Sequence, residues 1–199
     1  IRNVSPNPPV GAVVVSNGKV VGEGWTQPPG KNHAEIVALN QAKQLARGST
    51  LYITLEPCCF HGRTPPCIEA IVESGIKEVH VSILDPNPKV NGDGLAYLKN
   101  AGINVLVGER ADVAEKLIEG YKKYIVNQMP FVTVKYAMSL DGKIATRSGS
   151  SQWITGSEAR RYVHTLRGMN VAVVVGIGTA IADDPLFEAS RECRKAACN

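Results

Sequence analysis

The chain has 199 residues, of which 44% are hydrophobic, and a formal net charge of +4. This length and composition allow one or two domains with a sizeable core. No apolar run approaches the length needed to cross a bilayer, and no basic and apolar signal segment opens the chain, so no membrane partner is expected. The small positive charge is compatible with a phosphorylated substrate but is typical of a solvated surface. Five cysteines, an odd number, favour a reducing compartment, and we expect a cytoplasmic protein.

The first 127 residues alternate strand and helix signals. Strands are expected at residues 10–15, 20–25, 51–54, 79–83 and 105–107, and helices at 34–46, 67–74, 94–100 and 111–124. The Asn17-Gly18 pair between the first two strands is a strong hairpin signal. Helices interleaved with short apolar strands predict an α/β domain in which helices cover the sheet.

A domain boundary is expected near Pro130, which divides the chain into residues 1–128 and 129–199. Beyond it the sequence predicts a strand at 131–136, a turn at 139–143, a helix at 158–166 and a buried strand at 171–175. Only about seventy residues follow this boundary, whereas a doubly wound nucleotide-binding domain needs two halves. The second segment is therefore expected to be incomplete.

Four residues in two segments predict a catalytic metal site: His33 and Glu35, then Cys58 and Cys67. One histidine and two cysteines are zinc ligands, and a set of three leaves the fourth position for water, as in hydrolytic sites. Zinc-bound water loses a proton near neutral pH. Glu35 is not needed as a ligand and follows His33 at the start of a predicted helix, so we expect it to be the general acid/base. His-x-Glu followed by Pro-Cys and a second Cys is the signature of zinc-dependent deaminases.

Each of these residues alone would have a structural interpretation. A single histidine is most often a surface or satisfied core residue, and a cysteine is most often a small buried hydrophobe. The complete set in this order favours the metal site, and the predicted helix N-terminus at Cys67 favours its thiolate. Of the adjacent Cys58 and Cys59, only one can face the metal because neighbouring side chains point apart, and Pro57-Cys58 matches the motif.

Further segments extend this pattern along the chain. They are residues 57–67 (PCCFHGRTPPC), 5–11 (SPNPPVG), 85–88 (DPNP), 139–143 (SLDGK), 151–155 (SQWIT) and 183–185 (DDP). Together they resemble the bifunctional deaminase/reductase family of riboflavin biosynthesis, up to about Leu186. The spacing of eight residues between Cys58 and Cys67 is specific, because tRNA adenosine and nucleobase deaminases of the same superfamily normally place only two residues there.

The resemblance implies a cytidine-deaminase-like three-layer α/β/α domain followed by an incomplete dihydrofolate-reductase-like α/β segment. It also implies a substrate, 2,5-diamino-6-(5-phosphoribosylamino)pyrimidin-4(3H)-one, whose 2-amino group is displaced by water to give 5-amino-6-(5-phosphoribosylamino)uracil and ammonia. The positions implied to bind this substrate are Asn7, Arg63, Asp85 and Asn87. Asn7 before Pro8 and the residues at 85–88 are also ordinary turn sequences.

The second segment of this family is an NADPH-dependent reductase. The positions that match its cofactor site are Ala137, Trp153, Thr179 and Asp183, and those that match its substrate site are Ser151, Arg167 and Leu186. Trp153 could equally be a core anchor, and Arg167 a cation at a helix C-terminus. Because the rest of the reductase pattern is missing after Leu186, we expect neither reductase activity nor tight NADPH binding from this chain.

The sequence also departs from the family pattern in the deaminase half. The family's opening helix does not precede residues 5–11, Thr26 stands where a histidine is common, and Cys59 and Phe60 replace the usual Ser-His. These differences affect expected substrate contacts and leave the predicted metal ligands intact.

Two other functions remain open. One is a zinc deaminase of another nucleobase, nucleoside or tRNA, and the other is an inactive remnant in which zinc only holds the fold. The aromatic content of 6% and the long loop between the cysteines argue against a nucleic-acid partner. We expect a homo-oligomer that acts on a phosphorylated pyrimidine.

Overall fold

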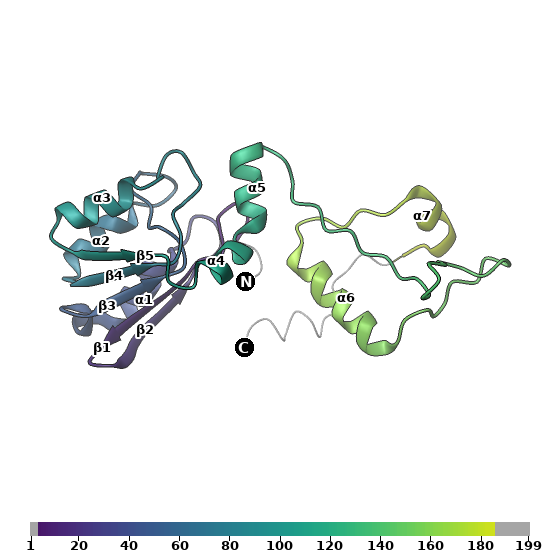
Figure 1. Cartoon of the computed structure of the whole chain (residues 1–199), viewed down its shortest axis with the longest axis horizontal. Coiled ribbons are helices and arrows are strands. Elements are labelled where there is room, and N and C mark those ends of the chain that lie inside the picture. Colours follow the sequence, from purple (N-terminus) through teal and green to yellow (C-terminus); the bar gives the residue numbers. More distant parts are fainter. Residues whose placement is uncertain (1–3, 186–199) are drawn as a thin grey trace. The chain divides into compact units, whose positions relative to one another are not determined.

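The structure is a computed structural model that describes residues 4–185, and these form two compact units, residues 4–131 and 132–185 (Figure 1). The first unit contains a five-stranded sheet in the order β2-β1-β3-β4-β5. Its strands are β1 (Gly11–Ser16), β2 (Lys19–Trp25), β3 (Thr50–Ile53), β4 (Glu78–Val81) and β5 (Asn104–Val107). β1 is antiparallel to β2 and β3, whereas β3, β4 and β5 are parallel. The α/β class and these five predicted strands are confirmed.

Three helices form one layer over this sheet: α1 (Ala34–Ala42), α2 (Cys67–Glu73) and α3 (Asp93–Asn100). α1 packs on β1 and β2, and α2 contacts both α1 and α3. α1 approaches β2 so closely that a Cβ atom at Gly22 or Gly24 would collide with its backbone carbonyl groups. The two glycines therefore fix the distance between α1 and the sheet.

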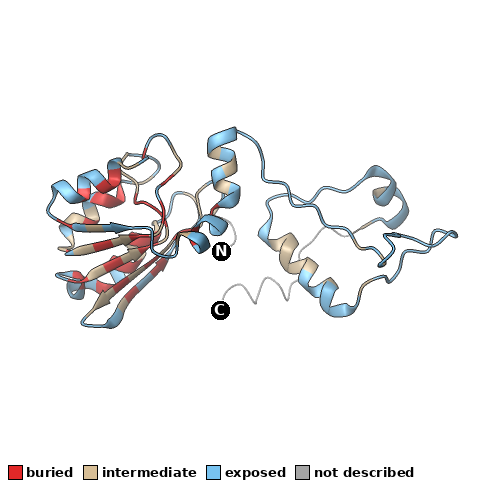
Figure 2. Ribbon diagram, viewed as in Figure 1, coloured by how far each residue is buried: buried red, intermediate tan, exposed pale blue. Residues whose placement is uncertain are grey.

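The core lies between the sheet and this helical layer (Figure 2). The buried sheet residues share one face, as the strand register requires, and are Ala12, Val14, Leu51, Ile53, Val79 and Val81. Side chains of the opposite face, such as Val13, Tyr52 and His80, are only half-buried.

Two predicted helices have different bounds in the structure. The helix expected at 34–46 ends at Ala42, because Lys43 has a positive φ of 52°, and a 3-10 turn, η1 (Lys43–Ala46), follows. The single helix expected at 111–124 is wrong: α4 (Ala111–Leu117) and α5 (Glu119–Asn127) are separated at Ile118. Ile118 is buried in the core, and its backbone (φ −100°, ψ 9°) changes the direction of the chain there.

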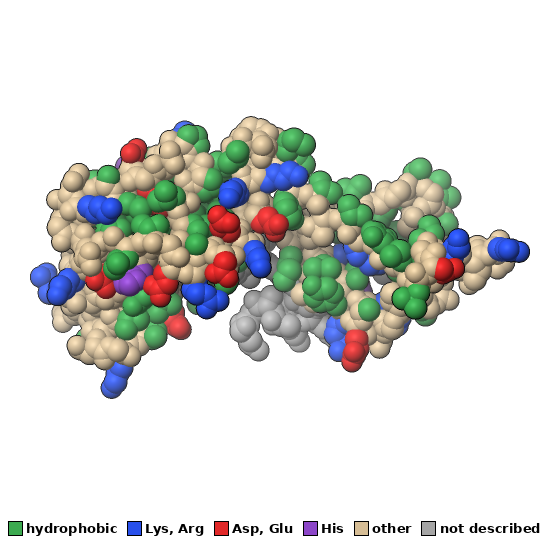
Figure 3. All heavy atoms as spheres, viewed as in Figure 1, with side chains coloured by type: hydrophobic (Ala, Val, Ile, Leu, Met, Phe, Trp, Pro, Cys, Tyr) green, Lys and Arg blue, Asp and Glu red, His purple; other side chains and the backbone are tan. Residues whose placement is uncertain are grey.

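The second unit contains α6 (Ser157–Met169) and α7 (Ile177–Asp183). α6 confirms the helix predicted at 158–166. The strands predicted at 131–136 and 171–175 are wrong, because the described residues there form no sheet pairing. A strand needs a hydrogen-bonded neighbour, and apolar composition alone does not provide one. Apolar side chains of these segments, including Val134 and Val174, are exposed. Figure 3 shows hydrophobic side chains at the surface of this unit.

Within residues 4–185, no helix combines the length and the apolar character needed to span a membrane.

Candidate metal centre and adjoining pocket

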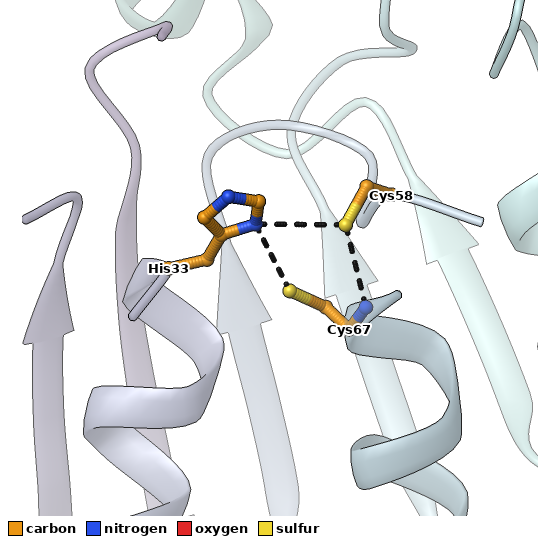
Figure 4. Close-up of side chains that lie close together, drawn as sticks. All are labelled: His33, Cys58 and Cys67. Atoms are coloured by element: carbon orange, nitrogen blue, oxygen red, sulfur yellow. Dashed lines mark hydrogen bonds between the residues drawn. The ribbon is translucent and has the colours of Figure 1, made fainter. Parts of the chain in front are cut away.

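His33, Cys58 and Cys67 come together from three separate elements. His33 is the residue that precedes α1, Cys67 is the first residue of α2, and Cys58 lies in the loop that follows β3. Because α1 and α2 pack against each other, their N-terminal ends bring the imidazole and the two thiols to one point (Figure 4). The structure therefore places the three predicted ligands in one cluster.

The distances within this cluster suit zinc. The Nδ1 atom of His33 lies 3.2 Å from the Sγ atom of Cys67 and 3.5 Å from that of Cys58. All three candidate ligand atoms lie within 4.8 Å of one another. Tetrahedral zinc with ordinary Zn–N and Zn–S lengths would separate such atoms by about 3.5–3.8 Å. The residues thus fit a zinc ion with little movement.

The other ring nitrogen of His33 faces Thr64. The Oγ1 atom of Thr64 lies 3.3 Å from Nε2. A neutral imidazole that presents Nδ1 to the two sulfur atoms carries its proton on Nε2, so this N–H donates to the Thr64 hydroxyl. Such a contact fixes the tautomer and the ring orientation of a metal-binding histidine.

Hydrogen bonding prepares one thiol for the loss of its proton. Hydrogen bonds with the Cys67 side chain, with His33 and with the Cys67 backbone N–H lower the pKa of Cys58 to about 4. Burial acts in the opposite direction but is outweighed. The backbone N–H lies 3.3 Å from the Cys58 sulfur. The hydrogen bond to Cys58 and burial raise the pKa of Cys67 above its ordinary value. A thiolate and a thiol at this point are typical of a site that releases a proton when a metal binds.

Glu35 lies in the first turn of α1, two residues after His33, and only 4% of it is exposed. Burial raises its pKa to about 7, because the charged carboxylate loses its hydration. A carboxyl group with such a pKa can both accept and donate a proton near neutrality.

A pocket of about 240 Å³ opens beside these residues. Its lining combines the metal cluster with polar and apolar side chains: Pro6, Asn7, Pro8, Val10, Thr26, His33, Glu35, Leu55, Glu56, Cys58, Phe60, Asp85, Asn87, Tyr121 and Ile125. The predicted acid/base and two of the predicted ligands therefore line one cavity.

Three of the four positions implied to bind substrate line this pocket, namely Asn7, Asp85 and Asn87. The turn interpretation of residues 85–88 is confirmed, because the backbone N–H of Asn87 donates to the Asp85 carboxylate over 2.9 Å, and a role in substrate binding stays a prediction. Arg63 lies in an exposed part of the loop between the cysteines and outside the pocket lining. The Sγ atom of Cys59 lies 3.7 Å from the carbonyl oxygen of Lys89.

Glu56 was missed by sequence reasoning. It is 3% exposed, and its carboxylate accepts backbone N–H groups from the chain that leads into α3. The donors are Gly92 at 3.0 Å, Gly94 at 3.1 Å, Asp85 at 3.2 Å and Leu95 at 3.3 Å. Glu56, which lies two residues before Cys58, thus fixes the loop that carries Asp85. A charged residue directly between an apolar strand and Pro57 was a signal that could have found it.

Tyr121 and Thr26 also contribute to the pocket. Tyr121 reaches Asp85 from α5, and no feature of the sequence marks it. Thr26 occupies the position at which a histidine is common in the family that the sequence resembles. Its hydroxyl accepts a hydrogen bond from the Val10 N–H over 2.9 Å and donates one to the Pro8 carbonyl over 3.0 Å. It therefore holds the chain that carries Asn7.

The residues implied for the reductase are spread over the second unit. Ala137, Ser151 and Trp153 lie outside regular elements, Arg167 lies in α6, and Thr179 and Asp183 lie in α7. Trp153 is 70% exposed and is therefore not a core anchor. The centre of its ring lies 4.4 Å from the guanidinium of Arg160. Leu186 lies outside the described residues.

Comparisons with known proteins agree with this geometry. Residues 2–83 match the cytidine and deoxycytidylate deaminase zinc-binding region, and residues 130–196 match the RibD C-terminal domain. Riboflavin biosynthesis protein RibD of Aquifex aeolicus is 54% identical over 180 residues, which cover 90% of this chain and 51% of the relative. The Escherichia coli RibD protein is 47% identical over 90% of this chain and 49% of its own length.

Solved structures give the same result. RibD of Acinetobacter baumannii matches with a TM-score of 0.87 and 49% identity, over 94% of this chain and 52% of that one. A Thermotoga maritima protein described as a diaminohydroxyphosphoribosylaminopyrimidine deaminase/5-amino-6-(5-phosphoribosylamino)uracil reductase matches with a TM-score of 0.87 and 46% identity, over 92% of this chain and 53% of that one. The chain spans about half the length of the curated relatives it matches. The resemblance is confirmed: over about 90% of its length, this chain is similar to RibD proteins of riboflavin biosynthesis.

Proposed function

We propose that this chain catalyses the hydrolytic deamination of 2,5-diamino-6-(5-phosphoribosylamino)pyrimidin-4(3H)-one to 5-amino-6-(5-phosphoribosylamino)uracil. The observation that carries the proposal is the cluster of His33, Cys58 and Cys67, whose ligand atoms lie within 4.8 Å of one another, next to a pocket that the buried Glu35 also lines. The description of the Thermotoga maritima relative as a deaminase of this class supports the choice of substrate. In this proposal residues 1–128 are the deaminase domain, and residues 129–199 belong to a reductase domain.

His33, Cys58 and Cys67 would hold zinc, which, when bound, would lower the pKa of water and supply hydroxide near neutral pH. Glu35 would take one proton of the attacking water and deliver it to the ring nitrogen, and would then carry the second proton from the new hydroxyl group to the departing 2-amino group. One C–O bond forms, one C–N bond breaks, and the amine leaves as ammonia. Burial keeps Glu35 close to the pKa at which both transfers are possible.

The polar wall of the pocket positions the substrate. Asn7, Asp85 and Asn87 provide hydrogen-bond donors and acceptors for the edge of the pyrimidine and its substituents. Arg63, exposed in the loop between the cysteines, is suited to the 5′-phosphate at the pocket mouth. A homo-oligomeric assembly, a cytoplasmic location and the absence of a nucleic-acid partner stay predictions.

Zinc analysis of the purified chain, combined with ammonia release from three substrates, tests the proposal. We expect about one zinc per chain and ammonia from the diaminopyrimidinone, but none from cytidine or adenosine. Release from cytidine or adenosine instead would support a different deaminase. Bound zinc without ammonia from any substrate would support an inactive remnant in which zinc only stabilises the fold.

A further inference from the structure

Tyr121 connects α5 to the polar wall of the deaminase pocket. Its hydroxyl lies 3.0 Å from Oδ1 and 3.4 Å from Oδ2 of Asp85. Burial and the adjacent Asp85 charge raise the pKa of Tyr121 above its ordinary value of 10. The hydroxyl therefore keeps its proton and is the donor in this contact.

One face of α5 is directed into the pocket. Tyr121 and Ile125 are four residues apart, so they lie on the same side of the helix, and both line the cavity. Tyr124 belongs to the same helix but is 50% exposed and is not part of the lining. The separation of α4 from α5 at the buried Ile118 gives α5 its own direction, and α5 thereby becomes one wall of the site.

Asp85 is held from two sides. Its backbone N–H donates to the buried Glu56 carboxylate over 3.2 Å, and this contact fixes the position of the Asp85 backbone. Its Oδ1 atom accepts both the Asn87 N–H and the Tyr121 hydroxyl. Asp85 is only 6% exposed, so few alternative donors from solvent can replace these contacts. With Oδ1 engaged twice, the direction of Oδ2 is set as well.

We propose that Tyr121 is a positioning residue that orients the Asp85 carboxylate for the substrate of the deaminase pocket. The inference rests on the proposed function, because it assumes that the substrate occupies this cavity. Tyr121 does not touch the reacting atoms. Its contribution is to substrate binding, since a free Asp85 side chain would have to be ordered when each substrate molecule binds.

The test compares Tyr121→Phe with Tyr124→Phe, the same substitution on the exposed side of the same helix. We expect Tyr121→Phe to raise KM for the diaminopyrimidinone by about tenfold, as befits the loss of one hydrogen bond to a charged group, with kcat changed less than about twofold. Tyr124→Phe should leave both constants unchanged. A thermal melt of each variant separates this from a structural role, which would lower the active fraction and kcat instead of raising KM.

A double-mutant cycle then asks whether Tyr121 acts through Asp85. In an Asp85→Ala background, Tyr121→Phe should raise KM by no more than about twofold. If Asp85→Ala does not fold, Asp85→Ser also removes the carboxylate while retaining a short polar group. An unchanged KM in Tyr121→Phe, or an equal effect with and without the carboxylate, would overturn the inference alone. A wild-type chain that releases no ammonia would overturn the proposed function, and with it this inference.

Discussion

The Oγ1 atom of Thr64 lies 3.3 Å from the Nε2 atom of His33, while the other ring nitrogen faces the sulfur atoms of Cys58 and Cys67. The hydroxyl is thus placed to accept a hydrogen bond from the imidazole N–H and to fix the ring for metal binding. Loss of the hydrogen-bond partner of a metal-binding histidine typically lowers metal affinity by about 10–100-fold. Thr64 lies in the loop between Cys58 and Cys67.

Replacement of Thr64 by valine, which has nearly the same shape, should therefore weaken zinc binding by about 10–100-fold. Thr64→Ser keeps the hydroxyl and should retain most of the affinity. Competition for zinc with a coloured chelator measures both variants against the wild type. Equal affinities for valine and wild type would show that the Thr64 hydroxyl does not support His33.

Cys58 and Cys59 should differ sharply in their effect on zinc content. Cys58 belongs to the cluster, whereas the sulfur of Cys59 faces the Lys89 carbonyl group. We expect Cys58→Ser to be depleted of zinc and Cys59→Ser to retain about one zinc per chain, measured by metal analysis after dialysis. The opposite result would move the ligand by one position along the chain.

The metal cluster could be predicted because each ligand belongs to a short motif whose spacing carries chemical information. His33 and Glu35 are two residues apart, and Pro57 marks Cys58. The contact of Tyr121 with Asp85 could not be predicted, because it joins residues 36 positions apart through the direction of α5. That direction depends on the break at Ile118, which apolar periodicity does not reveal.

The errors in the second unit have a similar origin. Residues 131–136 and 171–175 have strand-like composition, but a strand forms only where another backbone pairs with it. The five strands of the first unit have such partners, and Gly22 and Gly24 allow α1 to cover them. Apolar residues therefore predicted burial correctly in one unit and wrongly in the other.

His80 should make the stability of the first unit depend on pH. Partial burial lowers its pKa, but hydrogen bonds with Glu78 and Glu109, at 2.9 Å and 2.8 Å, outweigh this effect and raise the pKa above the ordinary 6.5. The same contact with His80 lowers the pKa of Glu78 below 4.5. The histidine's stabilisation is fully present below pH 6.5 and is lost as pH rises through its folded pKa, while that of Glu78 is lost as pH falls below 4.5.

Urea unfolding of the wild type and of His80→Gln should therefore differ most between about pH 4.5 and 6.5, and less above pH 8. Glu109→Gln removes only one of the two carboxylates that contact His80. Its stability between about pH 4.5 and 6.5 should therefore lie between those of the wild type and His80→Gln. A gap between wild type and His80→Gln that stays constant from pH 5 to pH 8 would contradict this account of the ion pairs.

NADPH should bind this chain only weakly. A dinucleotide site needs a crevice formed by a sheet, and the described residues of the second unit contain no paired strand. Fluorescence titration of the purified chain should give a dissociation constant well above the low micromolar range. Binding in the low micromolar range would show that the second unit forms a working cofactor site.

The central claim is that Glu35 moves the protons of a zinc-dependent deamination. Glu35→Gln keeps the shape of the side chain but cannot carry a proton, and Glu69→Gln is the matched control, since Glu69 lies exposed in the first turn of α2. Zinc content and ammonia release from the diaminopyrimidinone should be measured on the same preparations. We expect all three proteins to hold about one zinc, with ammonia release unchanged in Glu69→Gln and lowered by about a thousandfold or more in Glu35→Gln. Ammonia release near the wild-type rate from zinc-loaded Glu35→Gln would contradict the claim.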